Sequence, residues 1–95
     1  MKTMKFQCDD RYEAEKLASL VSMQRDDTVY VEGVAAAIDN EIVIKLKDKS
    51  SHAVLLKDKE NVARLESLIL DVVRGKIKIL SSDFSGSVAQ ITLGQ

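Results

Sequence analysis

The chain has 95 residues and a formal net charge of −1, with 45% hydrophobic and 31% charged side chains. This balance is typical of a globular chain and excludes simple disorder, and the length suits one domain, residues 1–95, with one core. Aromatic residues make up only 4% and proline is absent, which leaves little material for stacking nucleic-acid bases and none for a proline-rich docking segment. No apolar run approaches the roughly 18 residues of a membrane span.

The single cysteine, Cys8, excludes an intramolecular disulfide. A small chain without disulfides suits a reducing compartment, and the sequence turns polar at Gln7, too early for a secretory signal, so we expect the cytoplasm. Cys8 shares an alternating apolar face with Met4 and Phe6 and precedes two aspartates that would raise its pKa, which indicates a buried structural thiol rather than a nucleophile. Met1 and Met4 are both candidates for the native start, and the sequence does not distinguish between them.

The first elements are predicted to be a strand and a helix. The alternation over residues 2–8 predicts the strand, and Asp10 with Glu13 has the spacing of a capping box at the start of the helix. This helix is expected to run to about Met23. Its apolar stripe consists of Ala14, Leu17, Ala18 and Val21.

The next segment is predicted to be a β-hairpin. Residues 28–38 are rich in valine, alanine and isoleucine, Asp39-Asn40 tolerates the positive φ of a two-residue turn, and residues 41–47 alternate cleanly. A two-residue turn sets the register of the two strands. The expected opposite pairs are Ala37 with Ile42, Ala35 with Ile44, Gly33 with Leu46 and Glu32 with Lys47.

The other face of this hairpin is unusually apolar, because it carries Tyr30, Val34, Ala36, Ile38 and Val43. A half-solvated antiparallel sheet would show more polar residues there. Either the hairpin lies at the centre of its own domain, or another chain covers this face. With only two helices available, we expect a partner chain, and we predict an oligomer interface at Tyr30, Val34, Ile38 and Val43.

The rest of the chain is predicted to add a second helix and three strands. Asp58 is a candidate N-cap for a helix through about Arg74, and Gly75 suits the left-handed residue after it. The strands are expected at His52–Lys57, Lys76–Leu80 and Val88–Leu93, the last at an edge or pairing with another subunit, with a loop at Ser81–Ser87. No repeat at solenoid spacing is evident. The order β-α-β-β-β-α-β-β predicts an α+β domain with a mainly antiparallel sheet and two helices packed on one face.

Candidate chemical groups are few. One histidine and one cysteine stand about forty positions apart, and the pairs Asp9-Asp10 and Asp26-Asp27 are more typical of caps and loops than of a cation site, so neither a metal nor another cofactor is expected.

His52 follows two serines and lies close to Asp48, but a triad also needs an oxyanion hole, so a turn histidine is the simpler interpretation. We expect no catalytic residue and no enzymatic activity. The serine-rich segment 81–87 lacks the P-loop pattern and is interpreted as a plain turn rather than an anion-binding loop.

Charge is polarised along the chain. Residues 1–41 hold five basic and nine acidic side chains, whereas residues 42–80 hold nine basic and five acidic ones. If the strands of the second half are neighbours, their lysines form a basic patch that attracts phosphates. The candidate ligand or nucleic-acid contacts are Lys45, Lys47, Lys49, Lys76 and Lys78. Exposed lysines also protect strands from aggregation, which is the simpler explanation of the same residues.

Three functions therefore remain open from the sequence. The first is a small non-enzymatic regulatory module that forms a homo-oligomer and binds another protein, and it agrees best with the apolar hairpin face. The second is a binder of nucleic acid, a nucleotide or another phosphorylated ligand through the lysine-rich second half. The third is an enzyme at His52 or Cys8, for which the chain offers few supporting groups.

Overall fold

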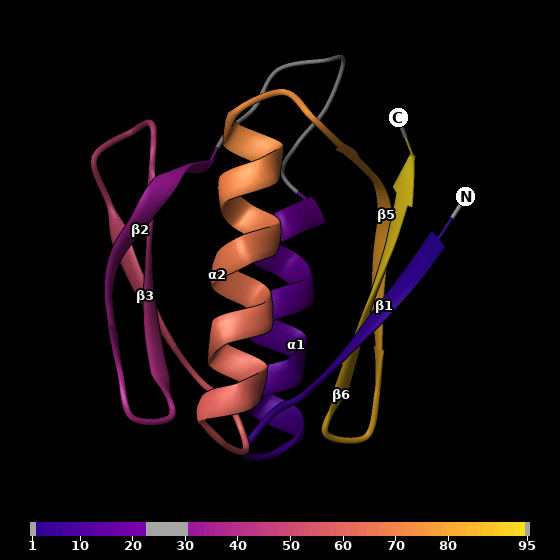
Figure 1. Cartoon of the computed structure of the whole chain (residues 1–95). Coiled ribbons are helices and arrows are strands. Elements are labelled where there is room, and N and C mark those ends of the chain that lie inside the picture. Colours follow the sequence, from indigo (N-terminus) through magenta and orange to yellow (C-terminus); the bar gives the residue numbers. More distant parts are fainter. Residues whose placement is uncertain (1, 23–30, 95) are drawn as a thin grey trace.

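The computed structural model describes residues 2–22 and 31–94, which form two helices between two three-stranded antiparallel sheets (Figure 1). The elements are β1 (Lys2–Gln7), α1 (Arg11–Ser22), β2 (Val31–Ile38), β3 (Glu41–Leu46), β4 (Ser51–Leu55), α2 (Lys59–Val73), β5 (Lys78–Ser85) and β6 (Val88–Gly94). The predicted α+β class and the order β-α-β-β-β-α-β-β are confirmed.

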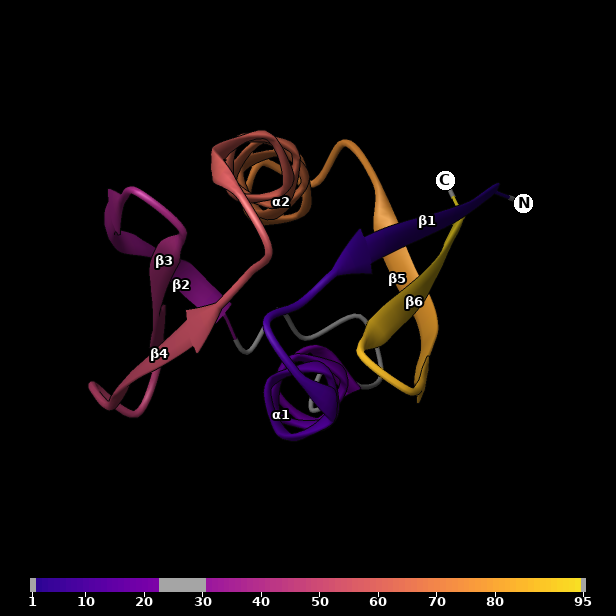
Figure 2. The same cartoon turned by 90° about the horizontal axis from the view of Figure 1, so that it is seen from below.

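The two sheets have the strand orders β1-β6-β5 and β2-β3-β4. They lie on opposite sides of the helix pair, seen from below in Figure 2, and α1 packs mainly on β5 and β6 while α2 packs mainly on β2 and β3. The expectation of a single sheet with both helices on one face is therefore wrong. It fails because the chain returns at its end to pair β6 with β1, which makes β6 the central strand of a second sheet rather than an edge strand.

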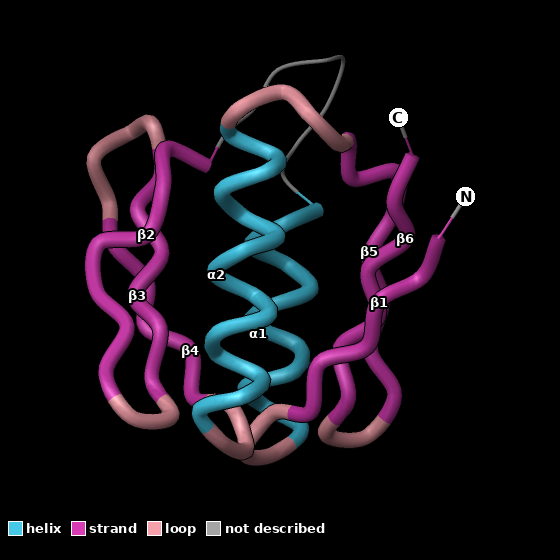
Figure 3. Tube along the Cα trace, viewed as in Figure 1, coloured by secondary structure: helices cyan, strands magenta, loops and turns pink. Residues whose placement is uncertain are grey.

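The chain consists of two β-α-β-β units, β1-α1-β2-β3 and β4-α2-β5-β6, related by an approximate two-fold axis between the helices (Figure 3). Each unit gives its first strand to the hairpin of the other, because β1 pairs with β6 and β4 pairs with β3. This duplication is not evident from the sequence, since the two units share few identical residues, among them Leu17 of α1 with Leu65 of α2. What they share is the apolar pattern.

Backbone hydrogen bonds join the two units where their first strands end. Cys8 and Leu56 form an isolated antiparallel bridge. Around it the Asp9 N–H donates to the Leu55 carbonyl at 3.0 Å, and the equivalent Lys57 N–H donates to the Gln7 carbonyl at 2.9 Å. The matched bonds place the two-fold axis at this bridge.

Both helices begin with the predicted aspartate caps, but the Glu13 carboxylate, the second half of the predicted capping box, accepts the Leu55 N–H instead. The Asp10 carboxylate accepts the Glu13 N–H at 2.9 Å, and the Asp58 carboxylate accepts the Asn61 N–H at 2.9 Å. These side chains satisfy N–H groups that have no partner within the first helical turn. Gly75 follows the C-cap of α2 with φ +76°, a conformation that strains any residue with a β-carbon.

The predicted hairpin turn is confirmed near Asp39-Asn40 and fails further away. Ala37 lies opposite Ile42 as expected, but bulges in β2 then shift the register, so that Val34 lies opposite Ile44. Each bulge inserts one extra residue, which a register counted from the turn cannot anticipate. The expected pairs of Ala35 with Ile44 and of Gly33 with Leu46 are therefore wrong; Leu46 lies opposite Val31.

The expected pair of Glu32 with Lys47 is also wrong, because Glu32 pairs with other lysines. The Glu32 carboxylate lies 3.4 Å from the Lys49 ammonium and 4.0 Å from that of Lys45. All three side chains are exposed or half-exposed, so these ion pairs add little to stability.

The serine-rich segment is mostly strand rather than loop. Residues 81–85 belong to β5, and only Gly86-Ser87 forms the turn into β6. Ser82 and Phe84 face inward, and the Ser82 hydroxyl donates to the Ala18 carbonyl in α1 at 2.7 Å. The polar composition that suggested a loop reflects a strand whose other face is solvated.

Candidate interaction surface

The inner faces of both sheets contact the helices, whereas no described element covers either outer face (Figure 2). β3 illustrates the division, because Ile42, Ile44 and Leu46 are buried while Glu41 and Val43 alternate with them and point outward. The two outer faces are equivalent under the approximate two-fold axis. Their side chains can therefore be compared position by position.

The outer face of β2-β3-β4, here called the apolar face, is built from three rows that run across the strands. Its central row is Ala36, Val43 and Ala53. The two flanking rows are Ile38, Glu41 and Leu55 on one side, and Gly33, Lys45 and Ser51 on the other. Ile38 is 68% exposed. Among these nine residues only one acidic and one basic side chain occur, and Glu32, at the bulge of β2 beside Gly33, adds a second carboxylate 4.0 Å from Lys45.

The outer face of β1-β6-β5, here called the polar face, has the same three rows with different chemistry. Its central row is Lys5, Gln90 and Asp83. The flanking rows are Thr3, Thr92 and Ser81, and Gln7, Val88 and Ser85. Leu80, at the bulge of β5, is the one large exposed apolar side chain among the described residues of this sheet. This is the composition expected of a sheet face in water.

The free edge of β4 is occupied by side chains of α1. Glu13 is buried, and its carboxylate accepts the Leu55 N–H at 2.8 Å. The Lys16 ammonium donates to the Ala53 carbonyl at 2.8 Å and lies 3.4 Å from Glu13. These bonds leave fewer open backbone groups on β4 for another strand.

The free edge of β1 is occupied in the same way by α2. The Asn61 side-chain oxygen accepts the Gln7 N–H at 3.0 Å, and the Arg64 guanidinium donates to the Lys5 carbonyl at 3.0 Å. Asn61 is the counterpart of Glu13, and Arg64 that of Lys16. The remaining sheet edges, β2 and β5, pair with no other strand among the described residues.

The structure places the predicted interface residues in three different settings. Ile38 and Val43 lie on the apolar face. Val34 lies opposite buried Ile44 and packs against the core, so it is on the inner side of the sheet. Tyr30 is outside the described residues. Ala53 and Leu55 belong to the same face but were missed, because their strand was not expected to pair beside Val43.

The predicted lysine patch is divided between the two sheets. Lys45, Lys47 and Lys49 lie on β3 and the turn after it, whereas Lys76 and Lys78 lie just before and at the start of β5. The sheets are separated by the helix pair (Figure 1). The premise that these strands are neighbours is therefore wrong, and the five lysines do not form one surface.

His52 forms part of a hydrogen-bonded turn. The Ser50 hydroxyl lies 2.9 Å from His52 Nε2 and also bonds to the Asp48 carboxylate. An ionised carboxylate only accepts, so the hydroxyl donates its proton to Asp48 and accepts from the imidazole. A nucleophilic serine needs the opposite direction, with its proton donated to the histidine.

Cys8 is buried, with 2% of its surface exposed, and its sulfhydryl donates to the Phe6 carbonyl. Burial raises the pKa of the Cys8 thiol to about 11, with smaller contributions in the same direction from Glu13 and Asp10. A thiol with this pKa is protonated at neutral pH and is a poor nucleophile.

Residues 2–22 and 31–94 contain no group of three or more histidine, cysteine or carboxylate side chains that could hold a metal ion. Asp10 serves as a helix cap, and Asp26 and Asp27 lie outside the described residues. Neither of the two helices in these ranges is long and apolar enough to cross a membrane.

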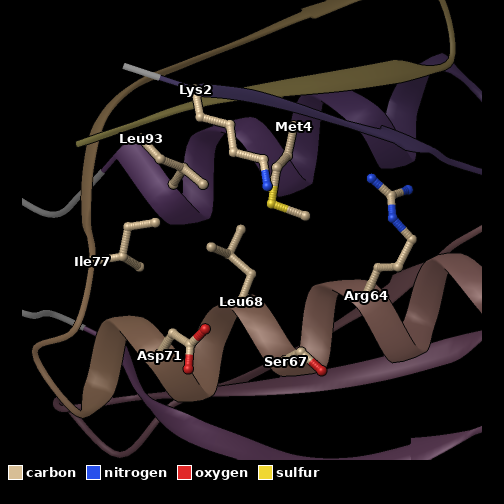
Figure 4. A pocket seen from close by; sticks show the side chains of 8 residues that line it. All are labelled: Lys2, Met4, Arg64, Ser67, Leu68, Asp71, Ile77 and Leu93. Atoms are coloured by element: carbon tan, nitrogen blue, oxygen red, sulfur yellow. The ribbon is translucent and has the colours of Figure 1, made fainter. Parts of the chain in front are cut away.

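A pocket of about 300 Å³ lies between α2 and the sheet β1-β6-β5 (Figure 4). Met4, Leu68, Ile77 and Leu93 form its apolar part, and its polar groups are Lys2, Arg64, Ser67 and Asp71. Arg64 is already engaged, because its guanidinium bonds to the Lys5 carbonyl and lies over the Phe6 ring. No sequence motif signals this pocket, since its lining comes from segments that only the tertiary fold brings together.

Comparison of the chain with protein-family models, with curated proteins and with solved structures gave no match. The class of this protein is therefore defined by its own architecture, a duplicated β-α-β-β domain in which two sheets enclose a helix pair.

Proposed function

We propose that this protein is a non-enzymatic interaction module that binds a protein surface through its apolar face. One observation carries the proposal: where the polar face has Lys5, Gln90 and Asp83 in its central row, the apolar face has alanine, valine and alanine. The two faces belong to equivalent sheets with equivalent contacts to the helices. The fold itself therefore imposes no need for apolar residues on an outer face.

The apolar face has the properties of a contact surface. Exposed apolar side chains gain free energy when a partner removes them from water, at about 25 cal/mol for each Å² buried. The small side chains of Ala36 and Ala53, and the absence of one at Gly33, allow a partner to approach the backbone closely. The nucleic-acid and phosphate hypothesis has weaker support, because its lysines lie in two separate groups.

The test exchanges equivalent residues between the two faces. In Val43→Gln, the apolar face receives the residue that the polar face carries at the same position, and in Gln90→Val the exchange is reversed. Both positions are solvent-facing, so we expect each change to alter the free energy of unfolding by no more than about 0.5 kcal/mol. Any difference in binding then reflects the surface rather than the fold.

Each variant and the unchanged protein would be immobilised and exposed to a cell lysate and to a differently tagged copy of the same chain. We expect a protein, identified by mass spectrometry or by the tag, to be retained by the unchanged protein and by Gln90→Val and lost from Val43→Gln. Retention by Val43→Gln, or the absence of any bound protein, would contradict the proposal.

A further inference from the structure

We infer that the partner of the apolar face is a second copy of this chain, stacked face to face about a two-fold axis that runs along the row of Ala36, Val43 and Ala53. This inference rests on the proposed function and specifies its partner. The axis lies between the two copies, perpendicular to β3, so each strand lies antiparallel over its own counterpart. Two sheets in such packing are about 10 Å apart.

The central row is compatible with its own copy. The axis places Val43 over Val43 of the second copy, with a small alanine on each side. No charge lies in this row, and its side chains are short enough for the two sheets to approach. The centre of the contact is therefore entirely apolar, as is typical of protein interfaces.

The flanking rows are complementary in charge. The two-fold axis exchanges them, so the row that contains Glu41 lies over the row that contains Lys45 of the second copy. Each Lys45, which lies 4.0 Å from Glu32 of its own chain, then faces Glu41 of the second copy, and Lys49, at 3.4 Å, is the nearer partner of Glu32. Opposite charges across an interface favour this register over others that place like charges together.

The flanking rows are also complementary in size. The same exchange places Ile38 over Gly33 of the second copy, and Leu55 over Ser51 of the second copy. An added Cβ at Gly33 would meet nothing within 4 Å, so the space above this glycine is open. Large side chains thus lie over small ones on both sides of the central row.

The polar face fails the same test. The same operation there would place Lys5 over its own copy and Asp83 over its own copy, because both lie in the central row. Like charges facing each other oppose association. Under this operation, therefore, only the apolar face is self-complementary.

The dimension of the apolar face indicates a reversible dimer. Three strands of about five residues each cover about 14 by 17 Å. A standard protein interface buries about 800 Å² on each partner, which is several times larger. We therefore expect a weak, reversible dimer whose population rises with protein concentration, rather than a permanent one.

The decisive experiment uses two charge reversals, Glu41→Lys and Lys45→Glu, in sedimentation equilibrium at low salt over a concentration series. Alone, each variant places like charges opposite each other at both ends of the dimer, and we expect its dimer to weaken by tenfold or more. Mixed in equal amounts, the two variants restore opposite charges in a heterodimer, and we expect an affinity close to that of the unchanged protein. Raising the salt to 1 M should reduce these differences.

The matched controls are Val88→Lys and Thr92→Glu, which alter the equivalent positions of the polar face. We expect neither to change the dimer. The inference is overturned if the unchanged protein stays monomeric at millimolar concentration, or if the mixture of the two charge variants shows no recovery. The proposed function has a separate test. If the unchanged protein is monomeric but binds a different protein, and Val43→Gln abolishes that binding, then the dimer inference fails while the proposed function survives.

Discussion

Leu17 in α1 and Leu65 in α2 occupy equivalent positions in the two β-α-β-β units, and both are completely buried. Val43 and Gln90 also occupy equivalent positions, at the centres of the two outer faces. One is apolar and the other is polar. Inward positions are restricted by the shared helix pair and are mostly apolar, and the inward Ser82 satisfies its hydroxyl by a hydrogen bond to the Ala18 carbonyl. Outward positions experience no such restriction, so a difference between the outer faces carries information about what each surface meets.

The largest loss of stability is expected in the core, where Leu17 and Leu65 occupy equivalent buried positions in the two units. Leu17→Ala and Leu65→Ala each remove a buried side chain, and we expect each to lower the free energy of unfolding by about 2–5 kcal/mol. Urea denaturation followed by circular dichroism gives both values. A cost below about 1 kcal/mol at either position would show that the two units do not share one equivalent core.

A smaller effect is expected at the strand edges. Glu13→Ala removes the buried acceptor of the Leu55 N–H, and we expect a loss of about 1–3 kcal/mol. Asn61→Ala removes the equivalent acceptor of the Gln7 N–H, but Asn61 is less buried and water can replace it, so the loss should be smaller. Urea denaturation compares the two variants, and hydrogen exchange at the Leu55 and Gln7 amides locates the effect. Equal losses would contradict the proposed difference between the two edges.

The smallest effect concerns the helix caps. The hydrogen bond from the Asn61 N–H holds the pKa of Asp58 below its ordinary value of 3.8. A carboxyl group whose pKa is lower in the folded state stabilises the fold above its unfolded pKa, and this contribution is lost as the pH falls through the folded pKa.

We therefore expect Asp58→Ala to lower the melting temperature slightly at neutral pH, and the difference from the unchanged protein to shrink as the pH falls below 3.8. Thermal melts over a pH series measure this. Asp10→Ala, at the equivalent cap of α1, is the matched variant. A difference for Asp58→Ala that is independent of pH would contradict the capping role of its charge.

Part of the apolar face was predictable from sequence. Ile38 and Val43 stood out because their apolar side chains fall on the solvent side of an alternating hairpin. Val34 was assigned to the same side, but the bulges in β2 turn it inward. Ala53 and Leu55 could not be identified, since their place depends on β4 lying beside β3.

The sequence by itself determined the two helices, their aspartate caps, the turn at Asp39-Asn40 and the order of the strands. These features depend on interactions between residues close together in the chain, which leave periodic patterns. Only the tertiary structure decided that β1 pairs with β6, that two sheets rather than one enclose the helices, and which outward rows are neighbours. Such choices depend on contacts between distant segments, where several pairings satisfy the same local pattern and only the packing of the whole core selects one.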